Sequence, residues 1–289
     1  MLKRFAAPLI LFVAFVSISC QELEPLDDQL SREVEEIDAY LKANVTDYVA
    51  YDQSGIRLVI HQFGDLPPIH KGQKLRARVR GKLFSNGNYF TDVSFNSLLD
   101  SIGGPGLQYG IASLMVGGEA SIYVPSKYAF GSTATNDIPA NSILVYEVKL
   151  EGVTRTAVEQ ERFTSDTTTI RRYIADNNLS GFELHPSGVW YKITDPGNTI
   201  FPRVYDGIHF IYTGSLLSNG NVFDEGTLSN TSPFGLIDGL KVGIPKMDEG
   251  GSAIFLIPSG LAYGPQGSGT SIPGNANLKF EVELTRVIK

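Results

Sequence analysis

Apolar and charged residues alternate near the carboxyl end of the chain. Leu278, Phe280, Val282 and Leu284 are separated by single charged residues, and this period of two predicts a β-strand with one buried and one exposed face. Residues 254–257 form a second apolar run, which predicts another strand shortly before it. This end of the chain is therefore predicted to contain two strands joined by a long connection.

The connection between these two strands is rich in glycine and proline, which predicts a loop. It carries two residues of chemical interest, Tyr263 and Ile272. A phenol and a branched apolar side chain held above a strand pair indicate a small hydrophobic pocket with one hydrogen-bond donor at its rim.

The pattern occurs twice, because one constant offset relates the two halves of the chain. Residues recur 133 positions apart in the pairs Gly55 and Gly188, Gly81 and Gly214, Phe90 and Phe223, Gly110 and Gly243, and Pro125 and Pro258. In the last loop the offset becomes 134, so that Tyr146 corresponds to Phe280. The chain is therefore predicted to contain two copies of one structural unit.

Each copy is predicted to be mostly antiparallel sheet. It begins with an apolar i, i+3, i+4 pattern typical of a helix, at 37–41 and at 170–174. A strand that opens with Ser-Gly follows, at 54–60 and at 187–193. The Asn-Gly pairs that end at Gly87 and Gly220 predict hairpin turns.

One further short helix is expected in each copy, at 107–114 and at 238–244. In the second copy Asp238 is the expected N-cap, and Pro245 is expected to stop the helix. Residues 154–169 are polar and rich in threonine, and they are predicted to connect the two copies.

The first twenty residues have the layout of a bacterial secretory signal. Lys3 and Arg4 precede an apolar run at 6–18 that is short for a membrane span. Small residues then precede Cys20, an arrangement that resembles a lipobox and predicts lipidation of this cysteine, although Ser17 stands where leucine is usual and another cleavage position stays open. Cys20 is the only cysteine, so no disulfide can form within the chain.

Composition limits the possible functions. With 289 residues, of which 42% are hydrophobic, the chain can form more than one domain with a real core. A net charge of −7 argues against a nucleic-acid partner, since phosphate binding needs clustered cations. The four histidines are scattered without metal-ligand spacing, so neither a metal nor another cofactor is expected.

The second copy resembles the FKBP-type peptidyl-prolyl cis-trans isomerases over residues 189–288. The resemblance rests on motifs in the right order at 209–224 (His-Phe-Ile-Tyr-Thr-Gly-Ser-Leu-Leu-Ser-Asn-Gly-Asn-Val-Phe-Asp), 236–240 (Leu-Ile-Asp-Gly-Leu), 257–264 (Ile-Pro-Ser-Gly-Leu-Ala-Tyr-Gly) and 272–280 (Ile-Pro-Gly-Asn-Ala-Asn-Leu-Lys-Phe), with Met247 and Gly250 between them. It implies an α+β fold of two FKBP-like units. Each unit would be a twisted antiparallel β half-barrel wrapped around a short helix, with an extra N-terminal helix.

The resemblance also implies a catalytic set in the second unit, namely Tyr212, Phe223, Asp224, Tyr263 and Phe280. Tyr263 would donate a hydrogen bond to the carbonyl of the bound amide, and Phe223 and Phe280 would shape the proline seat. Asp224 would orient Tyr212 or accept from a pocket hydrogen, and it would not act as a proton-transfer base. An apolar site that strips water from an X-Pro amide favours its twisted, less dipolar transition state over a barrier of about 18–20 kcal/mol.

Five more residues would line the substrate site by the same resemblance: Phe234, Leu236, Ile237, Leu240 and Ile272. The chain departs from the family in two places. Leu240 stands where tryptophan is frequent, and no arginine lies between Arg203 and Arg286, although the family often has one soon after the aspartate. Asp224 therefore needs another partner or stays partly solvated.

The first unit keeps the frame and loses most of the polar groups. Its Val79, Phe90, Thr91, Gly104, Leu107, Phe130, Ile138 and Tyr146 correspond to Tyr212, Phe223, Asp224, Ile237, Leu240, Tyr263, Ile272 and Phe280. Both tyrosines and the carboxylate are replaced. We therefore expect the first unit to be structural or to bind ligands, with weak or absent isomerase activity.

The sequence thus predicts a lipoprotein of the bacterial cell envelope, on the periplasmic or surface side of the outer membrane, whose second unit isomerises X-Pro bonds of exported proteins. Expected partners are proline-containing clients, the membrane through Cys20, and an FK506-like macrolide in the second unit. Two alternatives stay open: a non-catalytic chaperone or peptide-binding lipoprotein with the same folds, and a structural envelope component with relic pockets. The expected boundaries are a signal peptide at 1–19, a lipidated tether at 20–30, a degenerate FKBP-like domain at 31–153, a linker at 154–169 and an isomerase domain at 170–289.

Overall fold

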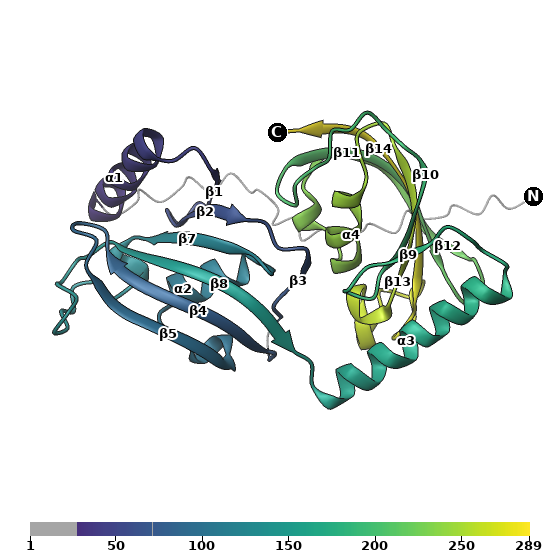
Figure 1. Cartoon of the computed structure of the whole chain (residues 1–289), viewed down its shortest axis with the longest axis horizontal. Helices are drawn as coiled ribbons and strands as arrows, with labels where there is room; N and C mark the ends of the chain where they lie inside the picture. The colour runs from purple at the N-terminus through teal and green to yellow at the C-terminus, as the bar shows by residue number, and fades with distance from the viewer. Residues whose placement is uncertain (1–27, 71) are drawn as a thin grey trace, which may run out of the picture. The chain divides into compact units, whose positions relative to one another are not determined.

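The computed structural model describes residues 28–70 and 72–289 (Figure 1). The predicted signal peptide, Cys20 and most of the tether lie outside these residues. The described chain divides into two compact units, and the division falls between Thr156 and Ala157. Among the helices of the described residues, none is long and apolar enough to cross a membrane.

The first unit contains a six-stranded antiparallel sheet in the order β1-β2-β7-β8-β4-β5, and β3 pairs with β6 in a small second sheet. Burial alternates along β4, as expected for a strand with one buried face. The elements are α1 (Asp28–Asn44), β1 (Tyr48–Tyr51), β2 (Arg57–Gln62), β3 (Leu66–Pro68), β4 (Lys74–Leu83), β5 (Tyr89–Leu98), η1 (Leu99–Ser101), α2 (Pro105–Ala112), β6 (Met115–Val116), β7 (Glu119–Val124), η2 (Ser126–Tyr128) and β8 (Leu144–Thr154).

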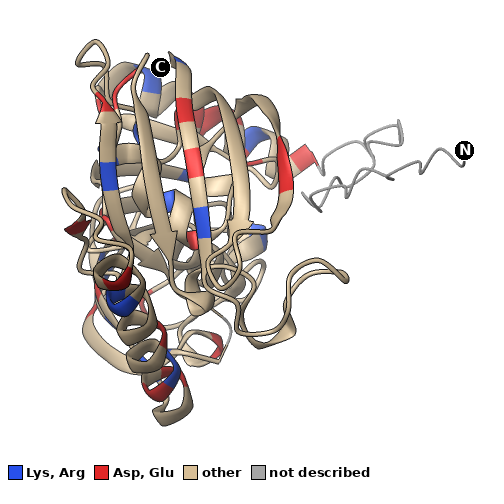
Figure 2. Ribbon diagram, turned by 90° about the vertical axis from the view of Figure 1, so that its right-hand side faces the viewer, with Lys and Arg blue, Asp and Glu red and all other residues tan. Residues whose placement is uncertain are grey.

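The second unit repeats this plan with a six-stranded antiparallel sheet in the order β12-β11-β14-β13-β10-β9. Figure 2 shows charged residues recurring along one strand of the sheet. In β14 the charged positions alternate with buried apolar ones. The elements are α3 (Ala157–Asp176), β9 (Glu183–Leu184), β10 (Trp190–Asp195), β11 (Gly207–Leu216), β12 (Val222–Thr231), η3 (Pro233–Gly235), α4 (Asp238–Gly243), η4 (Ile244–Lys246), β13 (Ser252–Ile257), η5 (Ser259–Leu261), η6 (Gly264–Gln266) and β14 (Leu278–Ile288).

These features confirm the predicted α+β class and the repeated antiparallel sheet. Both Asn-Gly hairpins are also confirmed, because β4 pairs with β5 and β11 with β12 across turns in which Gly87 and Gly220 have φ of 76° and 74°. Glycine reaches this left-handed region without the steric cost that a Cβ brings.

The short helix of each unit packs on the inner face of its sheet through glycines. In the second unit a Cβ on Gly243 of α4 would lie 2.8 Å from the ring of Phe255 on β13, and a Cβ on Gly239 would overlap Ile257. In the first unit the corresponding contacts join Gly106 and Gly110 of α2 to Val124 and Ile122 of β7. Because glycine has no side chain, helix and sheet approach closely in both units.

The N-terminal helix of each unit covers the opposite face of the sheet. Ile37 and Leu41 of α1 join a buried cluster with Tyr123 of β7, and Ile170 of α3 joins one with Leu256 of β13. Since Tyr123 alternates with residues that face α2, α1 and α2 lie on different faces of the sheet. An extra helix per unit was predicted from the sequence and is confirmed in both.

Two segments that were predicted to lack regular structure are helical. Helix α1 begins at Asp28, so the end of the predicted tether is helical, with Leu30 only 1% exposed. Helix α3 begins at Ala157 and takes in most of the predicted linker. Threonine lowers helix propensity, so the first part of α3 was predicted to be a linker. In this helix the hydroxyls of Thr167 and Thr168 donate to backbone carbonyls one turn earlier.

The predicted N-cap of the second short helix was wrong. Ile237 is the N-cap of α4, and Asp238 is its first helical residue. The Asp238 carboxylate instead accepts a hydrogen bond from Lys241 Nζ at 2.8 Å, one turn into the helix. The α-helix ends at Gly243, and Pro245 lies in the following 3-10 turn, η4.

Candidate functional site

The candidate site lies on the inner face of the second unit, where β11 runs between β12 and β14. Gly214 of β11 pairs with Asp224 of β12 on one side and with Phe280 of β14 on the other. A Cβ on Gly214 would lie 2.7 Å from the ring of Phe223 and 3.0 Å from the ring of Phe280. The glycine therefore allows both rings to lie over the middle strand.

The two phenylalanines form an edge-to-face pair, with ring centroids 5.7 Å apart and planes at 76°. Tyr212 extends the group, with its ring centroid 6.3 Å from that of Phe280. Phe280 is 2% exposed, whereas Phe223 is only partly buried. Phe280 is thus the buried part of this aromatic group, and Phe223 provides an apolar surface that remains accessible.

Tyr212 is a partner of Asp224, which was expected either to have a partner other than arginine or to stay partly solvated. The Tyr212 hydroxyl donates to Asp224 Oδ2 at 2.8 Å. Burial, followed by this hydrogen bond, raises the pKa of Tyr212 well above its ordinary value of 10.0. Tyr212 therefore stays protonated, and Asp224 is held toward the group without an arginine.

Tyr263 approaches the same group from the loop after β13. Its side chain is partly buried, and burial, followed by the negative charge of Asp224, raises the pKa of Tyr263 above 10.0. Within residues 28–70 and 72–289 the Tyr263 hydroxyl makes no hydrogen bond to the protein. A neutral phenol with an available proton is thus placed beside the aromatic rings. We call Tyr212, Phe223, Asp224, Tyr263 and Phe280 the aromatic site.

The other residues predicted for this site lie on the connections around it. Leu240 of α4 and Ile272 of the last loop are 4% and 3% exposed, whereas Ile237 at the start of α4 is partly buried. Leu236, just after η3, is 9% exposed. These four apolar side chains come from the short helix, from the two residues just before it and from the last loop.

Phe234 lies in the segment just before α4, and its ring has two neighbours of its own. Its ring stacks on Tyr205, with centroids 5.0 Å apart, and Lys241 Nζ lies 5.3 Å from its centroid. The ring contacts of Phe234 are thus with Tyr205 and Lys241, and its role in the substrate site stays a prediction. Tyr205 was missed because it stands alone between the motifs, with no periodic pattern around it.

The first unit builds the same frame with different chemistry. Gly81 pairs with Thr91 and Tyr146, and Phe90 and Tyr146 form an edge-to-face pair with centroids 6.0 Å apart. Val79 is buried where the second unit has Tyr212, and Phe130, at the position of Tyr263, is 42% exposed. This face has no carboxylate at the position of Asp224, and its one phenol is Tyr146, whose pKa burial raises to about 12.

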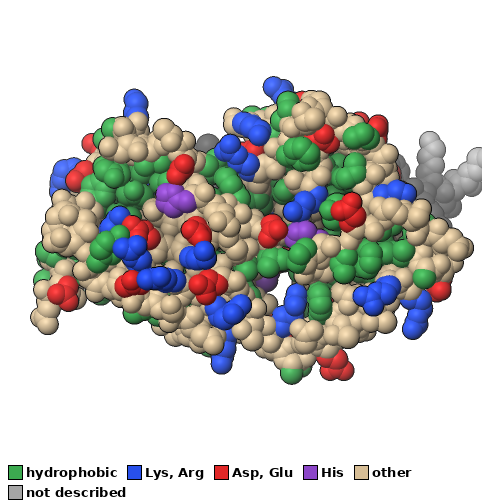
Figure 3. Space-filling view, viewed as in Figure 1, with side chains coloured by type: hydrophobic (Ala, Val, Ile, Leu, Met, Phe, Trp, Pro, Cys, Tyr) green, Lys and Arg blue, Asp and Glu red, His purple; other side chains and the backbone are tan. Residues whose placement is uncertain are grey.

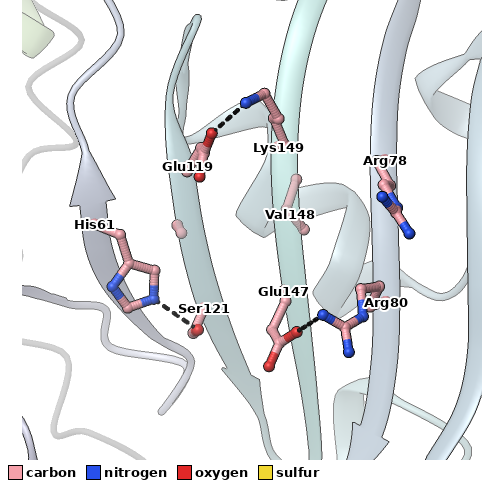
Figure 4. Close-up of a pocket in the computed structure, with 9 residues that line it drawn as sticks. His61, Arg78, Arg80, Glu119, Ser121, Glu147, Val148 and Lys149 are labelled. Atoms are coloured by element: carbon pink, nitrogen blue, oxygen red, sulfur yellow. Dashed lines mark hydrogen bonds and ion pairs between the residues drawn. The ribbon is translucent and has the colours of Figure 1, made fainter.

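A hollow of about 310 Å³ lies on the outer face of the first unit's sheet (Figure 4). Its charged side chains pair with one another, Arg80 with Glu147 at 3.3 Å and Lys149 with Glu119 at 2.5 Å. Figure 3 shows acidic and basic side chains mixed on this surface. Since Glu147 alternates with the inward residue Tyr146, the hollow lies on the face away from the aromatic pair. Paired, exposed charges of this kind do not indicate a ligand site.

Within the described part of the chain, no group of three or more histidine, cysteine, aspartate or glutamate side chains could hold a metal ion. The aromatic site consists of apolar rings, two neutral phenols and one carboxylate. Such groups can contact an apolar ligand, exclude water from it and donate hydrogen bonds.

An antiparallel sheet packed on a short helix, with an apolar site and phenol groups on its inner face, defines a class of α+β domains. The comparison with protein families identifies which one. The family described as FKBP-type peptidyl-prolyl cis-trans isomerase matches residues 67–151 and 198–285, together more than half of the chain. The chain belongs to this family, with one match in each unit.

Curated relatives agree with this assignment. A probable FKBP-type peptidyl-prolyl cis-trans isomerase FkpA of Neisseria meningitidis is 39% identical over 111 residues, which are 37% of this chain and 40% of the relative. The FKBP-type 22 kDa isomerase of Escherichia coli is 31% identical over 137 residues, 46% of this chain and 66% of the relative. FK506-binding protein 1 of Saccharomyces cerevisiae is 39% identical over 103 residues, 33% of this chain and 89% of the relative. The chain thus spans less than two thirds of the first two relatives.

Among solved structures, a peptidyl-prolyl cis-trans isomerase from Pseudomonas syringae pv. tomato aligns with a TM-score of 0.39 and 25% identity, covering 47% of this chain and 99% of that one. FkpA from Escherichia coli aligns with a TM-score of 0.39 and 28% identity, covering 46% and 63%.

Proposed function

We propose that the second unit is a peptidyl-prolyl cis-trans isomerase that acts on X-Pro bonds, and that the first unit contributes little or no activity. The observation that carries the proposal is the grouping of Tyr263 and the Tyr212–Asp224 pair around the edge-to-face rings of Phe223 and Phe280. The first unit retains such a ring pair but lacks these polar groups. Membership of the family supports the same activity.

The proposed mechanism uses no covalent step. A proline ring would rest on the accessible apolar surface of Phe223 above the buried Phe280, which removes water from the amide. Because the planar amide is the more dipolar form, its desolvation favours the twisted transition state. Tyr263, protonated and not hydrogen-bonded to the described protein, would donate to the amide carbonyl. Tyr212 would hold Asp224 so that its negative charge favours the protonated form of Tyr263.

The test is a cis-to-trans assay with an X-Pro peptide on the chain from Gln21 onward. Phe223→Ala is expected to lower kcat/KM about a hundredfold, because it removes the accessible half of the proline seat and about 2–3 kcal/mol of apolar contact with the substrate. Phe90→Ala is the matched control in the first unit and should leave the rate unchanged. A Phe223→Ala protein with the wild-type rate would show that the activity does not come from this site. Absence of activity in the wild type would favour a non-catalytic chaperone or a structural component.

We further infer that the natural clients are exported proteins and that Cys20 carries a lipid anchor at the outer membrane, on its periplasmic or surface side. The layout of the first twenty residues supports this. Mass spectrometry of the mature protein tests it, since a diacylglyceryl group on Cys20 is expected and an unmodified N-terminus at another position would contradict it. An FK506-like macrolide is expected to bind the second unit, and competition by FK506 in the peptide assay would measure this.

A further inference from the structure

A buried carboxylate in α3 holds the start of the loop that carries Tyr263. Asp166 is 2% exposed, and Ser259, the first residue of η5, is fully buried. Asp166 Oδ2 accepts from the Ser259 hydroxyl at 2.6 Å and from the Ser259 backbone N–H at 3.0 Å. Ser259 N–H also donates to Asn277 Oδ1 at 3.0 Å. The N-terminal helix is thus tied to the loop by charge-assisted hydrogen bonds, which are stronger than neutral ones.

The first unit contains the same tie. Glu33 of α1 lies 133 positions before Asp166, and Ser126 lies 133 before Ser259. Glu33 Oε1 accepts from the Ser126 hydroxyl and Oε2 from the Ser126 N–H, both at 2.7 Å. One extra methylene therefore lets glutamate use both oxygens where aspartate uses one. This constant spacing is a sequence signal by which the pair could have been found.

The tie lies close to Tyr263 along the chain. The carbonyl of Ser259 accepts from the N–H of Ala262 at 3.0 Å, and Ala262 directly precedes Tyr263. On the other side, the carbonyl of Gly264 accepts from the N–H of Asn275 at 2.7 Å. Tyr263 is therefore bracketed by two hydrogen-bonded residues, one of them anchored to α3.

We propose that Asp166 is a positioning residue for isomerisation, which fixes the turn at Ser259 and thereby holds the Tyr263 hydroxyl where the amide carbonyl arrives. This inference rests on the proposed isomerase function of the second unit. In the first unit the loop carries Phe130 at the position of Tyr263, and Phe130 has no hydroxyl to position, so Glu33 serves only the packing of α1. The same hydrogen-bonded pair thus has a positioning role in the second unit and a purely structural role in the first.

Matched isosteric variants of the chain from Gln21 onward test the proposal. Asp166→Asn and Glu33→Gln each replace the charged acceptor by a neutral amide, and both are expected to lower the thermal midpoint. Asp166→Asn should also lower kcat about tenfold with little change in KM, because a misplaced donor is lost mainly from the transition state. Glu33→Gln should leave kcat and KM unchanged. Equal rates for wild type and a folded Asp166→Asn protein would overturn the proposal.

Two further variants distinguish positioning from general loosening of the fold. In a Tyr263→Phe background, adding Asp166→Asn should cause no further loss of rate, since the group being positioned is already gone. Asp166→Glu should restore most of the activity, because glutamate makes the same tie in the first unit. A full additional loss in the double variant, or no recovery with glutamate, would reduce Asp166 to a structural residue.

A readout without turnover separates this inference from the proposed activity. In NMR titrations of the protein labelled at the tyrosine ζ-carbon, the Tyr263 resonance should titrate closer to the ordinary tyrosine value in Asp166→Asn than in wild type, because the ring leaves its place beside Asp224. Glu33→Gln should leave it unchanged. If the wild type shows no isomerase activity, the proposed function fails, whereas an unaltered Tyr263 titration in Asp166→Asn refutes the positioning of Tyr263 itself.

Discussion

The two units have the same frame, and on the inner face of the sheet the first unit lacks three polar side chains that the second unit has. Gly81 and Gly214 occupy the same position beneath an edge-to-face aromatic pair in their respective sheets. Only above Gly214 is this pair surrounded by a carboxylate and two additional phenols. The comparison teaches that packing alone maintains the frame, because the first unit has kept it without the groups to which we assign the chemistry.

The outer faces of the sheets have diverged as well. In the first unit every outward position of β4 is basic, and these charges meet acidic residues of neighbouring strands, such as Asp92 and Glu147. The corresponding strand of the second unit, β11, carries Ile211 and Thr213 there. Exposed ion pairs contribute at most about 1 kcal/mol each, so this surface changed at little cost to the fold. The inner face of the sheet is more constrained, because each side chain there contacts several others.

The largest expected effect comes from filling the space beneath the rings. A Cβ on Gly214 would lie 2.7 Å from Phe223, and one on Gly81 would lie 2.5 Å from Phe90. Gly214→Ala should therefore displace the proline seat and lower kcat/KM about a hundredfold, and Gly81→Ala should leave the rate unchanged. Each variant should also lose about 1–3 kcal/mol of stability through overpacking.

Peptide assays and chemical denaturation of the two glycine variants measure these effects side by side. Equal destabilisation with unequal rates would sharpen the contrast between the units. A comparable drop in rate from Gly81→Ala would show that the first unit is active, and the assignment of activity to the second unit would then be wrong.

The next largest effect is expected from Tyr263, the proposed hydrogen-bond donor. Tyr263→Phe removes one neutral hydrogen-bond donor, which contributes about 0.5–1.5 kcal/mol, so kcat/KM should fall roughly tenfold at most. The reverse change in the first unit, Phe130→Tyr, should not create activity, because Val79 and Thr91 still leave the new phenol without the Tyr212–Asp224 pair. Steady-state kinetics on both variants checks this. An appreciable gain of isomerase activity from Phe130→Tyr would mean that one hydroxyl group is sufficient for activity without the Tyr212–Asp224 pair.

Residue patterns predicted most of the frame, and the reasons are local, whereas the site residues were proposed from the resemblance to the family. The alternation of apolar and charged residues predicted β14, the Asn-Gly pairs predicted the hairpins, and the 133-residue offset predicted the repeat. Tertiary contacts decided the rest. The first part of helix α3, residues 157–169, was missed because its threonines weaken the local signal and because the partner of Asp166 is distant in sequence. The Tyr212–Asp224 bond could only be stated as one option, since no spacing rule specifies which group approaches a carboxylate.

Tyr212→Phe is expected to have a smaller effect than Tyr263→Phe. The ring and its contact with Phe280 remain, and only the hydrogen bond to Asp224 is lost. Without it the carboxylate is free to rotate away from Tyr263, and kcat/KM should fall about three- to fivefold, equivalent to just under 1 kcal/mol. The first unit already has Val79 at this position, so the matching control is Val79→Tyr, which should have no effect on rate. A larger loss than that of Tyr263→Phe would make Tyr212 the principal donor.

The smallest expected effect is that of pH. Burial, followed by Asp224, holds the pKa of Tyr263 above its ordinary value of 10.0, so the hydroxyl keeps its proton, and kcat/KM should be constant between about pH 7 and about pH 9. The raised pKa means that the folded state favours the protonated phenol. Its stabilising contribution is therefore complete below the ordinary tyrosine pKa and is lost as pH rises through the higher folded value. A rate that falls already between neutral pH and pH 9, in a protein that remains folded, would show that a group other than a neutral phenol limits the reaction. The neutral phenol of Tyr263 would then no longer explain why the second unit is active and the first is not.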